Sequence, residues 1–242
     1  MRQIEPGWSL DVMKKGRCLG LVGGLGVGAT IHYYRSLAQV HTERGCGLNI
    51  VIAHAETEQV FACVQAGDRD GLANYLAGFI HRLKAAGAEF AAIPAVTPHF
   101  CIRELVEMAP LPILNIFDPL VRQIATQGAK RVAVFGTRFV IESKLFGLAG
   151  EVEVCLPPQD EIEYIHATYT DLAKRGTGTE EQYRGLTDLA QKMQQRDDVD
   201  AIVLAGTDLS LLFNQSNTKF PAIDCAAIHI VEIANAMTTG SE

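Results

Sequence analysis

The chain has 242 residues, enough for one large domain or two small ones that each bury a hydrophobic core. Its composition is that of an ordinary globular protein, with 48% hydrophobic and 20% charged residues, and its net charge of −7 comes from scattered acidic side chains. This charge argues against nucleic acid and anionic membranes as partners, because both select a basic surface.

The first half of the chain alternates strand and helix patterns. Residues 1–16 precede the first strand, and we expect them to form an N-terminal extension. Apolar runs predict the strands, and apolar residues at helical spacing predict the helices. In chain order these are a strand at 17–22, a glycine-rich loop at 23–28, a helix at 29–40, a strand at 48–53, a helix at 71–86 closed by Gly87, and strands at 90–93 and 113–116.

The same order of elements begins again near residue 118. It runs through strands at 131–135 and 152–155, helices at 161–174 and 180–195, strands at 201–204 and 222–223, and a closing helix at 226–237. Thr179 is placed to cap the helix that follows it. Alternation of strands and helices indicates parallel sheets covered by helices, so we expect an α/β fold of two pseudo-symmetric lobes.

Two loops occupy corresponding places in these lobes. Residues 93–99 (IPAVTPH) and 204–209 (LAGTDL) each follow a strand pattern and lead into a helical pattern. Proteins of the α/β class place ligands at the carboxyl ends of parallel strands, so one loop from each lobe would face a shared cleft. We therefore expect lobe 1 to comprise residues 17–117 and 222–242, and lobe 2 to comprise residues 118–221.

The six cysteines lack the spacing of a metal site. They stand at positions 18, 46, 63, 101, 155 and 225 with no CxxC or CxxH pair, so we expect no bound metal. We expect reduced thiols in a cytoplasmic protein, because Cys18 and Cys155 fall within or beside apolar runs. There is no signal-like segment at the start, and no apolar run reaches the ~18 residues of a membrane helix.

Several short motifs, taken together in order, resemble those of the aspartate/glutamate racemase superfamily. They are Gly23-Gly24-Leu25-Gly26 with Ala29-Thr30 and Tyr33-Tyr34, Gly87-Ala88, Gly136-Thr137-Arg138-Phe139, and Ile223-Asp224 with His229. The two loops resemble that family's active-site motifs, usually Pro-Cys-Asn-Thr-x-His and Gly-Cys-Thr-Glu. The resemblance covers nearly the whole chain from residue 17.

The resemblance implies two α/β lobes, no cofactor, and a small carboxylate or amino acid bound between the lobes, usually in a homodimer. It also implies PLP-independent racemisation, in which one thiolate removes the α-proton and an opposed thiol returns a proton to the other face. In this chain Ala95 and Gly206 stand where the two cysteines are expected. Neither side chain can carry a proton, so the two-thiol reaction cannot run here.

Two further positions depart from the family pattern in the same direction. Val96 replaces the usual asparagine and Val140 a frequent threonine, whereas Asp208 keeps the acidic position after Thr207. These changes favour natural divergence over deliberate inactivation, and they make the pocket less polar. Because an unpaired second carboxylate would be costly there, we predict a bulkier or more apolar ligand than aspartate, held by one carboxylate.

The candidate ligand-binding residues come from four loops. They are Gly24, Leu25, Ala95, Val96, Thr97, Thr137, Val140, Gly206 and Thr207. The glycines would let the backbone approach a carboxylate, and their spacing does not fit a dinucleotide fingerprint, so we exclude NAD. Thr97 and Thr207, and by the same logic Thr137, would either only cap the following helix or also bind a carboxylate there.

Asp208 and His99 are the candidate groups for proton transfer. Asp208 would act as a general base if burial raises its pKa; otherwise it stabilises a helix N-terminus or pairs with His229. His99 would donate a proton or hydrogen-bond its own loop. Cys101, two residues after His99, is the thiol nearest in sequence to the position of the first expected cysteine, and we expect its side chain to point away from the cleft. Cys225 follows Asp224 near a strand end and is the better candidate for a surviving reactive thiol.

Three functions are compatible with these residues. The first is an isomerase of the racemase type in which a non-thiol base replaces the cysteines. The second is a catalytically inactive ligand-binding protein, a pseudoenzyme that keeps the cleft without the chemistry. The third is a lyase of the arylmalonate decarboxylase type, which suits an apolar pocket but also needs a thiol that is missing here.

Overall fold

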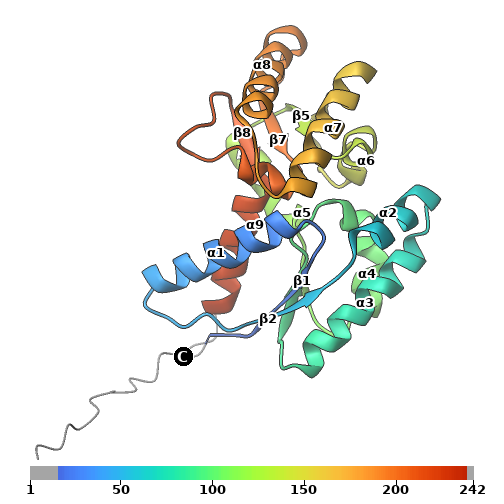
Figure 1. The fold of residues 1–242 in the computed structure, drawn as a ribbon, viewed down its shortest axis with the longest axis vertical. Coiled ribbons are helices and arrows are strands. Elements are labelled where there is room, and N and C mark those ends of the chain that lie inside the picture. The colour runs from blue at the N-terminus through green and yellow to red at the C-terminus, as the bar shows by residue number, and fades with distance from the viewer. Residues whose placement is uncertain (1–15, 239–242) are drawn as a thin grey trace, which may run out of the picture.

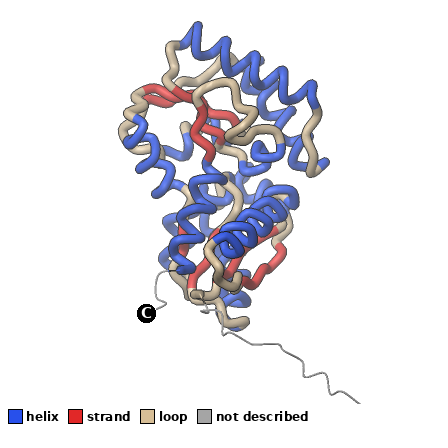
Figure 2. Tube along the Cα trace, turned by 90° about the vertical axis from the view of Figure 1, so that its left-hand side faces the viewer, coloured by secondary structure: helices blue, strands red, loops and turns tan. Residues whose placement is uncertain are grey.

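The computed structural model describes residues 16–238, so almost all of the predicted extension at 1–16 lies outside the described residues. Two lobes each contain a parallel four-stranded sheet flanked by helices, which confirms the predicted α/β fold class (Figure 1). Figure 2 shows the two lobes one above the other, with strands enclosed by helices in both.

The first lobe contains the sheet with strand order β2-β1-β3-β4. Its β1 lies between β2 and β3, with Leu19 in register with Ile50 on one side and with Phe90 on the other. The elements of this part of the chain are β1 (Leu19–Gly23), α1 (Val27–Glu43), β2 (Ile50–His54), α2 (Thr57–Ala66), α3 (Arg69–Ala85), β3 (Phe90–Ala92), the 3₁₀ helix η1 (Thr97–Cys101), α4 (Ile102–Met108) and β4 (Ile113–Leu114).

The second lobe repeats this arrangement, with strand order β6-β5-β7-β8. Val132 of its β5 is in register with Val154 on one side and with Ala201 on the other. The elements of this part of the chain are α5 (Phe117–Gln127), β5 (Arg131–Phe135), α6 (Arg138–Glu142), η2 (Leu145–Gly147), β6 (Glu153–Val154), α7 (Gln159–Arg175), α8 (Glu180–Asp197), β7 (Ala201–Leu204), η3 (Thr207–Leu211), β8 (Ala222–Asp224) and α9 (Cys225–Thr238).

The last strand and the last helix belong to different lobes. β8 pairs with β7 in the second sheet, whereas α9 lies beside α1 and packs on the first lobe (Figure 1). Ile230, Ile233 and Met237 of α9 share a buried cluster with Leu19 and Leu37. The expectation that all of 222–242 joins the first lobe is therefore wrong for β8, because its main chain completes the second sheet.

Local signals account well for the helices that have strong caps. Thr179 accepts a hydrogen bond from the main-chain N–H of Gln182, and the Gln182 side chain bonds back to Thr179, which confirms the predicted cap of α8. Among the described residues, no helix is both long and apolar enough to cross a membrane, and no group of three His, Cys, Asp or Glu is placed to hold a metal ion.

Candidate functional site

The loops that follow β3, β5 and β7 meet between the lobes. The Thr207 hydroxyl, after β7, donates a 2.9 Å hydrogen bond to the carbonyl oxygen of Pro94, after β3. The hydroxyl oxygens of Thr97 and Thr137 lie 3.3 Å apart, so one donates to the other. Each of these bonds joins the first lobe to the second. The carboxyl ends of the two sheets therefore face each other, and the three threonine hydroxyls lie at their junction.

Two of these hydroxyls do not serve the helices that they begin. The N-caps of η1 and η3 are Val96 and Gly206, and neither 3₁₀ helix has a side-chain cap. The capping interpretation is therefore wrong for Thr97 and Thr207, whose hydroxyls bond across to another loop instead. Thr137 does cap α6, because its hydroxyl oxygen accepts the N–H of Val140 at 3.3 Å.

Asp208 fastens the second lobe to the N-terminus of α1 in the first. Its side chain is fully buried, and Oδ1 accepts the main-chain N–H of Ala29 at 2.8 Å. A carboxylate here is stabilised by the partial positive charge of the helix N-terminus. Gly26 caps this helix at φ +119°, and a Cβ on it would lie 2.5 Å from Oδ2 of Asp208, so only glycine fits. Burial raises the pKa of Asp208 above its ordinary value.

Tyr169 of α7 belongs to this site, although no sequence pattern points to it. Its phenol donates a 3.3 Å hydrogen bond to Oδ2 of Asp208. A Cβ built on Gly206 would lie only 2.8 Å from Cδ2 and 2.9 Å from Cζ of the Tyr169 ring. The ring therefore covers the position where the resemblance led us to expect the second cysteine. Burial raises the pKa of Tyr169 well above 10.0, so its phenol stays protonated at neutral pH.

Both ring nitrogens of His99 are engaged by the main chain. Nδ1 lies 2.9 Å from the carbonyl oxygen of Ala95, and Nε2 lies 3.2 Å from the main-chain nitrogen of Ile116. Because a carbonyl only accepts, Nδ1 carries the proton and Nε2 accepts the N–H of Ile116. Burial lowers the pKa of His99 to about 4, so the ring is neutral at pH 7. These bonds hold the loop after β3 against the start of α5.

His229 does not pair with Asp208, which corrects one of the alternatives for that carboxylate. Its Nε2 lies 3.0 Å from the carbonyl oxygen of Leu114, so Nε2 carries the proton. Its Nδ1 therefore accepts the hydroxyl of Tyr33 at 3.1 Å. Burial lowers the pKa of His229 to about 3. This neutral histidine links α9 to α1 and β4 within the first lobe.

The glycine-rich loop after β1 packs closely against neighbouring segments of the first lobe. Gly24 has φ +90°, and a Cβ on it would overlap the carbonyl oxygen of Ala55. Its N–H donates to the hydroxyl of Thr30, and its carbonyl accepts from Thr57. Leu25 is buried next to it. The loop thus presents a rigid backbone beside the site.

Apolar side chains surround the threonine hydroxyls at the junction. Ala95, Val96 and Val140 are all buried. Val96 comes from the first lobe but packs in the core cluster of the second, together with Val140 and Leu209. The contact between the lobes is therefore apolar around the threonine hydroxyls.

Neither Cys101 nor Cys225 is a reactive thiol in this fold. Cys101 is buried in the core of the first lobe, and Cys225 in that of the second. Burial raises the pKa of Cys101 to about 12, and it raises the pKa of Cys225 as well. The Cys101 thiol donates to the carbonyl oxygen of Pro98. Both thiols stay protonated at neutral pH and pack as small hydrophobes.

This assignment predicts the order in which the cysteines react. Iodoacetamide at pH 8 should modify the half-buried Cys46 and Cys155 at least tenfold faster than Cys101 and Cys225, because only accessible thiolate is alkylated. Peptide mapping by mass spectrometry of the native protein measures the four rates. Rapid modification of Cys101 or Cys225 would show that a reactive thiolate survives in the fold.

Comparison with known proteins places this arrangement in context. The profile of the Asp/Glu/hydantoin racemase family matches residues 22–233. The chain is 24% identical over 148 residues to the broad specificity amino-acid racemase RacX of Bacillus subtilis (strain 168), a match that covers 60% of this chain and 63% of that protein. The chain therefore spans less than two thirds of that relative.

Two solved structures share the fold. The crystal structure of a proposed Asp/Glu racemase from Yersinia pestis has a TM-score of 0.75 and 26% identity, covering 90% of this chain and 98% of that one. An arylmalonate decarboxylase structure has a TM-score of 0.55 and 13% identity, covering 92% of this chain and 93% of that one. The second likeness extends to the fold alone.

Proposed function

The chain belongs to the Asp/Glu/hydantoin racemase family, and on this premise we propose that it binds a small carboxylic or amino acid between its lobes. The observation that carries the proposal is the meeting of three threonine hydroxyls, Thr97, Thr137 and Thr207, at the facing ends of the two sheets. The hydroxyls of Thr97 and Thr137 bond to each other, and the hydroxyl of Thr207 bonds to the carbonyl oxygen of Pro94. A carboxylate would exchange these neutral hydrogen bonds for stronger charge-assisted ones.

The surrounding side chains favour a ligand with an apolar substituent. Ala95, Val96 and Val140 offer no partner for a second carboxylate, and an unpaired charge against them would be costly. We therefore propose a monocarboxylate whose α-substituent is bulkier or more apolar than that of aspartate. Leu25 and Gly24 would bound the same space from the β1 side.

Racemisation by paired thiols is not part of this proposal. Ala95 and Gly206 carry no transferable proton, and the Tyr169 ring covers the Gly206 side. His99 has no free ring nitrogen in the structure, so we assign it a positioning role for the loop after β3. The protein would thus bind its ligand without inverting it by the reaction typical of its family.

A second candidate function is proton transfer by Asp208. It is favoured by burial, which raises the pKa of this carboxylate in the direction that suits a general base. Asp208 would take the α-proton, exchange it with solvent and return a solvent-derived proton to the same face, while the phenol of Tyr169 stays protonated and orients the carboxylate. With one such group on one side, the reaction would be exchange of the α-proton rather than two-sided inversion.

Binding and exchange can be separated in one experiment. L-Leucine, L-phenylalanine and mandelate should raise the melting temperature more than L-aspartate does, and none should gain deuterium at the α-carbon in deuterium oxide, as read by mass spectrometry. Thr97→Val should weaken carboxylate binding about 10–100-fold, the loss expected for one hydrogen bond to a charged group. Thr42→Val, on the exposed face of α1, is the matched control.

The outcomes distinguish the candidate functions. If none of these acids stabilises the protein, or if Thr97→Val binds as well as Thr42→Val, the carboxylate site is wrong. Deuterium exchange that disappears in Asp208→Asn would establish the second function in place of simple binding.

We also propose the homodimer that the resemblance implies, supported by the exposed side chains of Val27, Ile31 and Tyr34 along one face of α1.

A further inference from the structure

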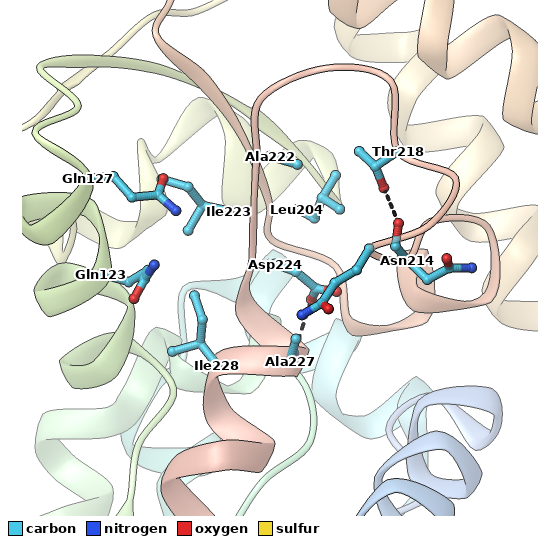
Figure 3. Close-up of a pocket in the computed structure, with 11 residues that line it drawn as sticks. Gln123, Gln127, Leu204, Asn214, Thr218, Ala222, Ile223, Asp224, Ala227 and Ile228 are labelled. Atoms are coloured by element: carbon cyan, nitrogen blue, oxygen red, sulfur yellow. Dashed lines mark hydrogen bonds between the residues drawn. The ribbon is translucent and has the colours of Figure 1, made fainter.

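A hollow lies outside the interlobe junction, between α5, β8 and the start of α9 (Figure 3). It encloses about 210 Å³, less than the roughly 300–1,000 Å³ of pockets for drug-sized ligands, so it suits a small molecule. Its polar lining consists of Gln123, Gln127, Asn214, Gln215, Thr218 and Asp224. None of the junction threonines lines it, and neither does Asp208.

Among the residues that line this pocket, Asp224 is the one with a charged side chain. Four carboxamides, one hydroxyl and the carboxylate of Asp224 provide hydrogen-bond acceptors, and none of the lining residues, all of them described, is Lys, Arg or His. The side chains of Gln123, Gln127 and Gln215 make no hydrogen bond with any residue that the structure describes. A ligand with a positive charge and several N–H donors would match these groups.

Asp224 is held in place by one oxygen and leaves the other without a partner. Oδ1 accepts the main-chain N–H groups of Ala226 at 2.8 Å and Ala227 at 3.2 Å, at the N-terminus of α9. Oδ2 accepts no hydrogen bond from the described part of the chain. The carboxylate is therefore oriented before any ligand binds, which lowers the entropy cost of using it.

Near Asp224 the negative charge meets the two N–H groups of α9 but, among the described residues, no charged basic side chain. The nearby base is His32 of α1, and burial lowers the pKa of His32, so it is neutral at pH 7. Burial also raises the pKa of Asp224, which means that its negative charge costs free energy in this position. A cation in the pocket would recover part of that cost.

We propose that this pocket binds a small molecule through a primary ammonium group, with Oδ2 of Asp224 and the amide oxygens of Gln123 and Gln215 accepting its N–H bonds. The ligand would touch α5, which carries the chain into the second lobe, and β8 and α9, through which the chain returns to the first. It would thus bridge the two connections between the lobes. This site and its ligand are separate from the carboxylate proposed for the junction.

The surface next to the pocket gives room for the rest of such a molecule. An adjoining hollow of about 320 Å³ shares Gln123, Gln215, Ala227 and Ile228 with the pocket. It continues between α5 and α9 to the ion pair of Arg122 and Glu232, whose nitrogen and oxygen are 2.8 Å apart. The ammonium group would lie at Asp224, with the remainder extending along this groove.

The test uses n-propylammonium chloride as the probe. Propionamide and sodium propionate, at the same ionic strength, are matched controls without the positive charge. Saturation-transfer NMR on the full-length protein should show saturable binding of the ammonium ion in the millimolar range. It should show no saturable binding of propionamide or propionate. Asp224→Asn should weaken this binding at least tenfold, while the exposed Asp188→Asn on α8 should leave it unchanged. Asparagine still caps α9, so the fold is kept.

A second variant tests the pocket without removing Asp224. Gln123→Lys places an ammonium group of the chain beside Asp224, and it should abolish binding of n-propylammonium and raise the melting temperature. The proposal is overturned if the wild-type protein shows no saturable binding, if propionamide or propionate binds equally well, or if Asp224→Asn keeps the wild-type affinity. Carboxylate binding at the junction is measured separately, so its failure leaves these results readable.

Discussion

Replacing Asp208 with alanine is expected to lower the free energy of unfolding by about 2–6 kcal/mol, since it leaves two buried donors unpaired at about 1–3 kcal/mol each. The two donors are the N–H of Ala29, at the start of α1, and the phenol of Tyr169. The carboxylate is fully buried, so water cannot easily replace it. Urea unfolding at pH 7, followed by circular dichroism, measures the loss.

Asp208→Asn is the matched variant, because its amide oxygen still accepts the N–H of Ala29, and its loss at pH 7 should be the smaller one. The stability of the wild-type protein and that of Asp208→Asn should also depend differently on pH. Burial raises the pKa of Asp208 above 3.8, so the folded protein keeps this proton where the unfolded chain has lost it. The stability contributed by Asp208 therefore falls as pH rises from 3.8 towards the raised pKa.

The pH series gives a clear sign to look for. The stability of the wild-type protein minus that of Asp208→Asn should decrease as pH rises above 3.8. A difference that increases with pH would mean that folding lowers the pKa of Asp208, and it would remove the argument for a general base. An alanine variant as stable as the asparagine variant would show that the link between Asp208 and α1 contributes little.

Gly206→Cys is expected to destabilise the protein by about 1–3 kcal/mol, the usual cost of overpacking a filled position. Gly206 has φ −134°, which any residue adopts, so the cost comes from contact with the Tyr169 ring and not from the backbone. Adding Tyr169→Ala removes that ring. The double variant should therefore lose less stability than the sum of the two single variants.

Tyr169→Phe is the control for this double-mutant cycle, because it keeps the ring and removes only the hydroxyl that bonds Asp208. Gly206→Cys should remain costly in that background. Strict additivity of Gly206→Cys and Tyr169→Ala in urea unfolding would show that the ring does not exclude a side chain at Gly206. If the coupling is observed, a thiol at this position and the ring of Tyr169 are alternatives.

The fold could be predicted from the sequence where local patterns are strong. The strand at 201–204 coincides with β7, and Thr179 with Gln182 forms the expected start of α8. α2 and α5 were not identified. The N-cap of α2, Glu56, makes no side-chain cap hydrogen bond. For α5 a start signal was present but not used, because the side-chain oxygen of Asn115 accepts the N–H groups of Phe117 and Asp118.

The site was predictable as far as its loops, but its pairings were not. The loops after β3 and β7 carry recognisable motifs, and they do meet. Tyr169 lies mid-helix, 39 residues from the Asp208 that it bonds, and no local pattern marks it. The proton position on His99 depends on Ile116, which only the folded chain brings close. Thr97 and Thr207 stand where helix caps are expected from the sequence. Only the folded chain shows that their hydroxyls bond across the lobes instead.

The route of the chain through the two lobes bears on how the protein is made. Each sheet is built from one uninterrupted stretch of chain, but the core around Leu19 and Leu37 also needs Ile233 and Met237 from α9. During synthesis the first lobe therefore exposes apolar surface until α9 has been made. That surface is covered when α9 packs on it, so the core of the first lobe is completed by a helix made after the strands of both sheets.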